Sequence, residues 1–235
     1  MFLAEAGTVV LTGPTLRAFP GSGASAVGVR GGGDGGRVGT AGSGTMYALR
    51  PDAGVEPGVL LVASPTLGDP NFRRTVVYVL DHRTDGSVGV VLNRPSDVTL
   101  LDVLPQWFEL ASSPRTLFVG GPVETNAALC LAEARAGATP SGWTAVSGPV
   151  GLADLDTDPE ALERDLHQLR VFAGYAGWGG GQLAAEIAES AWLVVAGHAS
   201  DVFADPGGDL WRDVLRRQGG SVALLATYPD DARLN

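Results

Sequence analysis

Two apolar runs joined by a short polar turn constrain the fold of this chain more than any other feature. The runs TVVYVL and SVGVVL occupy residues 75–80 and 87–92. Successive residues of a strand point to opposite faces of a sheet, so strands that are apolar at nearly every position are covered on both faces. Asp85 and Gly86 supply the positive φ angles that a tight hairpin turn needs. The sequence therefore predicts an antiparallel hairpin at the centre of a covered sheet.

Charged and amide side chains mark the open end of this hairpin. If His82 faces Ser87 across the turn, Val76 lies opposite Asn93. The side chains that then gather at the end away from the turn are Arg73, Arg74, Asn93 and Arg94. In one interpretation the arginines form salt bridges with nearby carboxylates and end the strands. In the other they form an anion-recognising pocket, in which guanidinium groups and the asparagine amide face a small acidic ligand.

The rest of the chain from residue 58 alternates between strand and helix patterns. Strands are predicted over 58–64, 115–122, 127–133, 142–148, 150–156, 170–178 and 191–197, and helices over 99–108, 160–169, 181–190 and 209–218. Asp158 and Pro159 have the residue types preferred at an N-cap and at the first helical position. Strands outnumber helices and the first pair is antiparallel, so the sequence predicts an α+β fold with a mixed sheet.

The first 55 residues differ in character from the rest. Residues 21–45 are dominated by glycine and small residues with almost nothing to pack, so residues 1–55 are expected to be a disordered extension. The domain is expected to span residues 56–235, and Met46 is a candidate for the true start of translation. Gly31, Gly33 and Gly36 match a dinucleotide-binding pattern, but no strand precedes them and no helix follows.

Charge and composition narrow the classes of function. The formal net charge is −10, which disfavours binding to nucleic acid, and no apolar run reaches the ~18 residues of a membrane helix. The N-terminus lacks a basic residue before its apolar part, so we expect a cytoplasmic protein. Cys130 lies in an apolar run and is expected to be a buried, inert thiol. The three histidines have no ligand spacing, so we expect no metal and no cofactor.

A glycine-rich segment, GYAGWGGGQL at residues 174–183, precedes a predicted helix. Unpaired backbone amides at the start of that helix could receive an anion beside Gln182. Alternatively, the glycines let a strand and a helix pack closely while Trp178 fills the core. Gly120 and Gly121 form a second close-approach turn at a strand end. Glu186 lies one helical turn beyond Gln182, where it could orient that side chain or simply face water.

Four ordered motifs together resemble the YqgE/AlgH family of bacterial proteins. They are PTLGDPNFRRTVVY from residue 65, VVLNRP ending at residue 95, GGPV from residue 120 and GYAGWGGGQLAAEI from residue 174. The glycine-rich extension and the run Gly179–Gly181 depart from the family pattern. The resemblance implies a single α+β domain whose mixed, largely antiparallel sheet is partly barrel-like and flanked by helices. Members of this family have been described as transcriptional regulators, so the resemblance implies that role as an alternative. It implies no chemical reaction.

The leading hypothesis is an accessory protein that binds a small anionic ligand or a protein partner. The expected pocket is edged by eight residues: Asp69, Phe72, Arg73, Asn93, Gly120, Gly121, Trp178 and Gln182. Arg74, one position along from Arg73, is expected to project to the opposite side. The alternatives are a transcriptional regulator and an enzyme of unidentified reaction. The sequence offers no nucleophile or base for an enzyme, so it assigns no catalytic residue.

Overall fold

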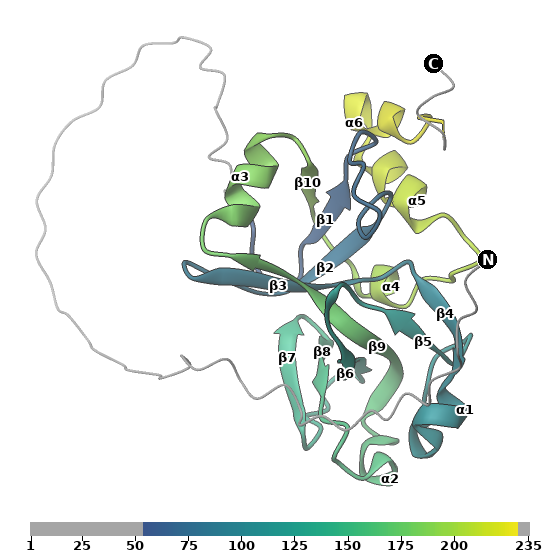
Figure 1. Ribbon diagram of the computed structural model, residues 1–235. Helices are drawn as coiled ribbons and strands as arrows, with labels where there is room; N and C mark the ends of the chain where they lie inside the picture. The colour runs from purple at the N-terminus through teal and green to yellow at the C-terminus, as the bar shows by residue number, and fades with distance from the viewer. Residues whose placement is uncertain (1–53, 230–235) are drawn as a thin grey trace, which may run out of the picture.

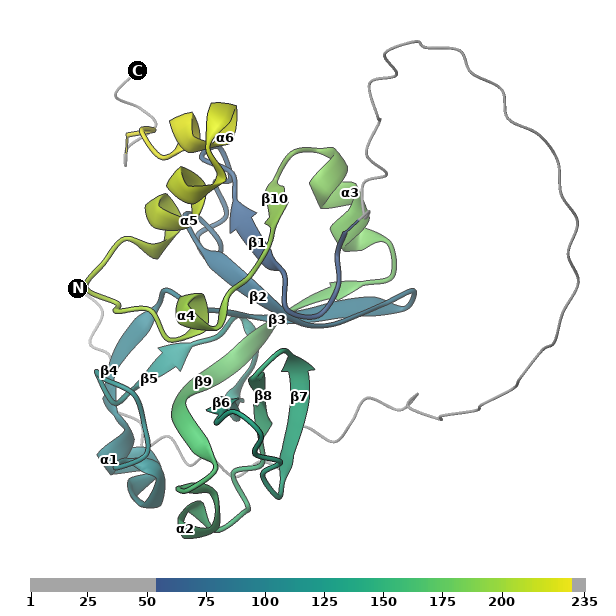
Figure 2. The same cartoon turned by 180° about the vertical axis from the view of Figure 1, so that it is seen from behind.

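The computed structural model describes residues 54–229 (Figures 1 and 2). The predicted disordered extension and the candidate start at Met46 lie outside these residues, apart from Gly54 and Val55. The described part is a single α+β domain with a curled, half-barrel sheet and flanking helices. The fold class predicted from the sequence is therefore confirmed.

The described residues contain ten strands in one mixed sheet. Eight of them follow the order β10-β1-β2-β3-β9-β6-β8-β7, while β5 pairs with β9 and β4 pairs with β5. All pairs are antiparallel except β5 with β9. The strands are β1 Leu60–Ala63, β2 Val76–Arg83, β3 Gly86–Val91, β4 Pro95–Thr99, β5 Thr116–Val119, β6 Val123–Ala134, β7 Trp143–Ser147, β8 Val150–Ala153, β9 Leu166–Gly179 and β10 Trp192–Val195.

Short helices close the curled sheet. They are α1 Leu100–Val103, the 3-10 turn η1 Pro105–Trp107, α2 Pro159–Leu162, α3 Gln182–Ala188, α4 Ala199–Val202, α5 Leu210–Gln218 and α6 Gly220–Leu225. Asp158 caps α2 as predicted, because its side chain accepts a hydrogen bond from the Glu160 amide. The predicted helix over 160–169 is shorter than expected, because Leu166–Gln168 instead pair with β6 as the start of β9.

The central hairpin forms as predicted, but its turn and its register differ from expectation. Neither Asp85 nor Gly86 has the positive φ angle expected of it, and the two strands are joined through Thr84 and Asp85. His82 faces Ser87, as expected, but a register shift between Val79 and Asp81 places Val77 opposite Val91. A β-bulge of this kind moves all later pairs by one residue and increases the local twist. Val76 therefore lies opposite Leu92 rather than Asn93, and the Leu92 amide donates to the Val76 carbonyl at 2.9 Å.

Three apolar clusters fill the domain on different sides of the sheet. The concave cluster lies inside the curl, where Trp211, Val214 and Leu215 of α5 pack against β1, β2, β3, β6 and β9. The outer cluster lies between β6, β8 and β9 and the helices α1 and α2. The α3 cluster lies between α3 and the strands β1, β2 and β10. In both views α3 lies on one side of β1 and β10, with α5 and α6 on the other (Figures 1 and 2).

One buried arginine ties the centre of the sheet to the chain around α4. Arg170 of β9 is 2% exposed, and its guanidinium lies 4.3 Å from the centre of the Phe118 ring. It donates to the carbonyls of Val202 and Ala204 at 2.9 and 3.0 Å. Burial lowers its pKa to about 10, and the negative charge of Asp205 opposes that shift. Arg170 thus fixes the segment that leads from α4 toward α5.

Candidate functional site

Three of the expected site residues belong to an aromatic cluster under α3. The ring of Phe72 stacks on Trp178 at 6.1 Å and meets the edge of Trp192 at 5.5 Å. The Glu186 carboxylate accepts the indole N–H groups of Trp178 and Trp192 at 2.9 and 2.8 Å. Gln182 donates to the other Glu186 oxygen at 2.9 Å, so the predicted orientation of Gln182 by Glu186 is confirmed.

The polar atoms of Gln182 are engaged within the protein. Its amide oxygen accepts from the Gly179 backbone at 3.1 Å, and its amide nitrogen bonds to Glu186. One of the backbone amides expected to receive an anion before α3 is therefore occupied by the neighbouring side chain.

Asn93 and Asp69 act on the backbone at the start of β2. The Asn93 amide oxygen accepts from the Val76 amide at 3.1 Å, and its nitrogen donates to the Arg74 carbonyl at 2.8 Å. Asp69 accepts a hydrogen bond from the Asn71 amide on its side chain and one from the Arg73 amide on its carbonyl. Both side chains thus shape the loop that leads into β2.

Gly120 and Gly121 lie where β5, β9 and β3 approach one another. The Gly120 amide donates to Ala173, and its carbonyl accepts from Val91. A Cβ atom at Gly121 would lie 2.2 Å from the backbone of Tyr175, and φ at Gly121 is +155°. Close packing of backbones, one of the two interpretations of such turns, accounts for both glycines.

The neighbouring arginines Arg73 and Arg74 have different surroundings. Arg74 has a φ of +55°, donates to the Tyr228 carbonyl at 2.8 Å, and lies 4.4 Å from the centre of the Trp211 ring. It holds the C-terminal end of the described chain against α5. Arg73 is exposed, and within residues 54–229 its guanidinium has no hydrogen bond or ion pair.

Arg73 lies beside Arg94, which follows β3. The Arg94 guanidinium donates to the Arg73 carbonyl at 3.1 Å. Burial lowers the pKa of Arg94, the charge of Arg73 lowers it further, and the Asp69 carboxylate opposes both effects. Two cations this close together create a locally positive surface on an acidic protein.

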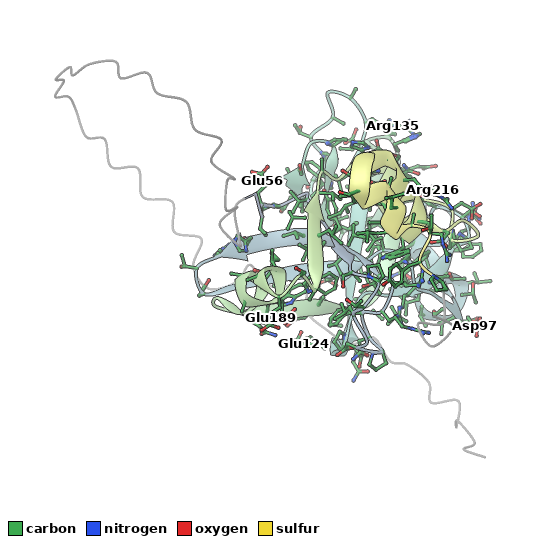
Figure 3. All side chains as sticks on the ribbon, turned by 90° about the horizontal axis from the view of Figure 1, so that it is seen from above. Glu56, Asp97, Glu124, Arg135, Glu189 and Arg216 are labelled. Atoms are coloured by element: carbon green, nitrogen blue, oxygen red, sulfur yellow. The ribbon has the colours of Figure 1, made fainter. Side chains whose placement is uncertain are left out.

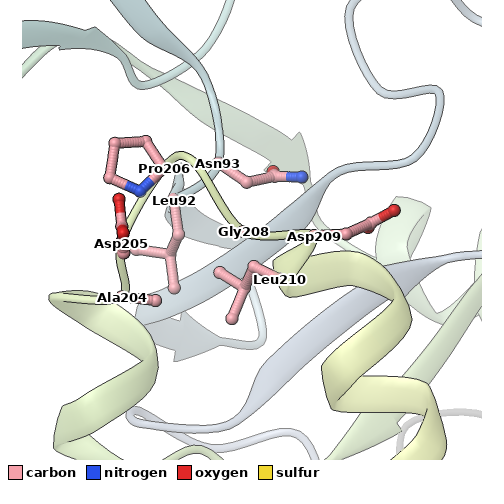
Figure 4. Close-up of a pocket in the computed structure, with 8 residues that line it drawn as sticks. All are labelled: Leu92, Asn93, Ala204, Asp205, Pro206, Gly208, Asp209 and Leu210. Carbon is pink, nitrogen blue, oxygen red and sulfur yellow. The ribbon is translucent and has the colours of Figure 1, made fainter.

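The pocket that Asn93 lines is acidic. It has a volume of about 170 Å³ and is lined by Leu92, Asn93, Ala204, Asp205, Pro206, Gly208, Asp209 and Leu210. Asp205 and Asp209 lie on opposite sides of it, with Leu92 and Leu210 between them (Figure 4). Neither Arg73 nor Gln182 lines this pocket, and its two carboxylates repel anions. The anion pocket shared by all eight residues stays a prediction, and Arg73 is its best-placed member.

A larger cavity, which the sequence did not reveal, opens beside β7. Its volume is about 820 Å³, and it is bounded by the hairpin β2–β3, the α1–η1 segment and the strands β6, β8 and β7. Its lining residues are Pro57, Leu80, Asp81, Arg83, Val88, Leu104, Gln106, Ala128, Leu129, Cys130, Gly142, Trp143, Thr144, Ala145, Val146, Leu152, Ala153, Asp154, Leu155 and Asp156. They come from several separate stretches of sequence, so no local sequence pattern predicts the cavity.

The polar groups of this cavity are mainly acidic. Asp81, Asp154 and Asp156 line it together with Arg83, and Arg83 forms an ion pair with Asp81 at 2.8 Å. Cys130 is 1% exposed, and burial raises its pKa to about 12, so the predicted burial of this thiol is confirmed and its low reactivity stays a prediction. A second cavity of about 360 Å³ adjoins it and shares Asp81, Arg83 and Val88.

The described part of the chain offers neither a metal-binding cluster nor a membrane-spanning helix. No group of three or more histidine, cysteine or carboxylate side chains within residues 54–229 is placed to hold a metal ion. None of the helices between Gly54 and Pro229 has the length and hydropathy needed to cross a bilayer. Charged side chains such as Asp97, Glu124 and Arg216 project from the surface (Figure 3).

Relatives of known sequence cover the same part of the chain. A UPF0301 protein of Streptomyces avermitilis is 52% identical over 182 residues, which are 76% of this chain and 94% of the relative. A UPF0301 protein of Mycobacterium tuberculosis is 48% identical over 184 residues, which are 77% of this chain and 91% of the relative.

Solved structures and a family model agree with these relatives. A crystal structure of a Corynebacterium diphtheriae protein matches with a TM-score of 0.71 and 32% identity, over 77% of this chain and all of the other. The solution structure of AlgH from Pseudomonas aeruginosa matches with a TM-score of 0.53 and 29% identity, over 82% of this chain and all of the other. The AlgH-like family model matches residues 60–223. The chain therefore belongs to the AlgH-like family.

Proposed function

We propose that this protein is a cytoplasmic accessory protein that acts by binding, with the 820 Å³ cavity beside β7 as its main binding site. The cavity itself is the observation that supports this function. Its volume lies within the range of roughly 300–1,000 Å³ found for ligand sites, and its lining combines many apolar side chains with a few charged ones. Apolar walls supply affinity and a few polar groups fix orientation, which is the usual composition of a binding site.

A cavity-filling variant tests this proposal. Ala145 lies on exposed β7 and lines the cavity, whereas Ala188 is exposed on α3, outside it. Nile red, a neutral fluorescent dye, should bind the wild-type protein, and Ala145→Trp should weaken its binding at least about tenfold, or 1.4 kcal/mol. Ala188→Trp should bind the dye as the wild type does. Equal binding by both variants would reject the cavity as the site.

A second candidate function, binding of a small anion, is supported by the pair Arg73 and Arg94. A carboxylate or phosphate placed between them would gain charged hydrogen bonds and relieve their mutual repulsion. Inorganic phosphate, titrated while backbone amide NMR shifts are followed, should move the signals of Asp69, of residues 71–74, and of Asn93 and Arg94.

The Arg73→Ala variant should weaken this binding by at least ~1.5 kcal/mol, the lower range for a hydrogen bond to a charged group. Arg135→Ala, another exposed arginine, is the matched control. Arg74 does not suit that purpose, because its guanidinium anchors the C-terminal segment. Equal phosphate affinity of Arg73→Ala and Arg135→Ala would leave the arginine pair without a binding role.

A further inference from the structure

The strand β7 forms one edge of the sheet. Within residues 54–229 it pairs with β8 alone, and its sequence, WTAVS, contains neither a charged residue nor proline. Its pairing is regular from Trp143 to Ala145 and shifts register before Ser147. Edge strands usually carry charges or prolines that prevent another strand from pairing with them. The first four residues of β7 therefore present a strand edge that can accept a further strand.

The 820 Å³ cavity runs along this same edge. The four consecutive residues from Trp143 to Val146 all line it. Val146 packs on the concave cluster, whereas Trp143 packs on the outer cluster, so the cavity lining includes side chains from both faces of β7. Side chains of a strand alternate between faces, so a segment added to β7 would direct alternate side chains to the two sides of this edge.

Charge distinguishes between the possible occupants of this edge. The described residues contain eleven arginines and twenty-one acidic residues, and three of the four ionisable side chains of the cavity lining, leaving aside Cys130, are aspartates. A second copy of the chain would bring the same negative charge to the contact and be repelled. A basic segment would instead be attracted to the cavity.

We propose that β7 binds an extended, basic segment of a partner protein, which adds to the sheet as a further strand. This inference rests on the proposed binding role of the cavity and names its ligand class. Main-chain hydrogen bonds to β7 supply affinity, while apolar side chains fill the cavity and basic side chains face its carboxylates. Five to seven residues suffice to cover β7 at ~3.3 Å per residue.

Peptide binding to the full-length protein tests the mode of recognition. The probe is a fluorescein-labelled seven-residue peptide in which valine and arginine alternate, and its dissociation constant is measured by fluorescence anisotropy. One comparison peptide carries glutamate in place of arginine. Another has N-methyl groups on alternate backbone nitrogens, which remove the donors of one strand edge while keeping every side chain. We expect each change to weaken binding at least about tenfold, or 1.4 kcal/mol.

Two protein variants locate the contact on β7. Ala145 and Ser147 are both exposed residues of β7, but only Ala145 lines the cavity. Ala145→Lys should weaken binding of the valine–arginine peptide at least about tenfold. Ser147→Lys should change the affinity for this peptide less than about threefold. Hydrogen exchange of the β7 amides should slow when the peptide is added. Circular dichroism spectra and melting temperatures that match the wild type establish that both variants are folded.

The outcomes separate this inference from the proposed function. Strand addition is rejected if the N-methylated peptide binds as tightly as the parent peptide. It is also rejected if the Ala145→Lys variant binds the parent peptide as tightly as the wild-type protein does. If no peptide binds while Nile red binding remains sensitive to Ala145→Trp, strand addition is likewise rejected and the cavity keeps its binding role. If neither peptide nor dye binds, both proposals fail. If the molar mass doubles as the protein concentration rises, and the Ala145→Lys variant keeps the monomer mass, the occupant of the β7 edge is a second copy of the chain.

Discussion

Removing the Glu186 carboxylate should destabilise the domain by leaving two indole N–H groups without their acceptor. Trp178 is 5% exposed and Trp192 is 3% exposed, and both donate to the same Glu186 oxygen. A buried donor that loses its partner costs about 1–3 kcal/mol. Glu186 itself is only half-buried, so water can replace part of the lost bonding. We therefore expect Glu186→Ala to lower the free energy of unfolding by about 2–3 kcal/mol in total.

Urea unfolding followed by tryptophan fluorescence measures this loss, because the affected rings are themselves the reporters. Glu189→Ala is the matched control, since Glu189 is an exposed carboxylate at the end of the same helix. Surface substitutions of that kind usually change stability by less than ~0.5 kcal/mol. In a Trp192→Phe background, which lacks one of the two N–H donors, Glu186→Ala should cost about 1 kcal/mol less. If Glu186→Ala and Glu189→Ala unfold at the same urea concentration, the carboxylate does not stabilise the cluster.

Four further results are expected. Gly121→Ala should destabilise the domain by at least ~2 kcal/mol in urea unfolding, because the added Cβ meets the Tyr175 backbone, whereas Gly68→Ala, with open space around it, should be neutral. Cys130, whose pKa burial raises to about 12, should resist iodoacetamide at pH 8 until the protein is unfolded, and rapid alkylation of the native protein would contradict its burial. Duplex DNA should bind no more tightly than micromolar at physiological salt in an anisotropy titration, because the net charge is −10, and tighter binding would favour a transcriptional regulator. A chain that starts at Met46 should match the full chain in urea unfolding to within ~0.5 kcal/mol, because residues 1–45 precede the family match at 60–223 and residues 21–45 have almost nothing to pack, and a larger loss would show that they stabilise the domain.

Local patterns predicted the parts of the fold that depend on neighbouring residues. The hairpin of β2 and β3, the Asp158 cap and the contact between Gln182 and Glu186 all involve residues close in sequence. The bulge near Leu80 and the early start of β9 at Leu166 depend on strands elsewhere in the sheet. A helical pattern over 160–169 could not show that Leu166 would pair with Ala134 of β6, which is distant in the sequence.

The candidate site, like the fold, was predicted from the sequence only in part. Phe72, Trp178 and Gln182 were expected at one site and do lie around Glu186, but Trp192 was missed, although a tryptophan at the start of a strand was visible in the sequence. The 820 Å³ cavity was missed because its lining comes from several separate stretches of sequence between Pro57 and Asp156. Concave sites built from strand ends become visible only when the topology brings those ends together.

The two arginines at the start of β2 show how one backbone angle separates a structural role from a binding role. A regular strand would point Arg73 and Arg74 to opposite faces of the sheet. The left-handed φ of +55° at Arg74 instead accompanies a side chain that reaches Tyr228 and the ring of Trp211. Asn93 accepts from Val76 and donates to the Arg74 carbonyl, so the hairpin itself holds that unusual conformation. Arg74 donates to the Tyr228 carbonyl in the C-terminal segment, whereas the guanidinium of Arg73 is exposed near Arg94.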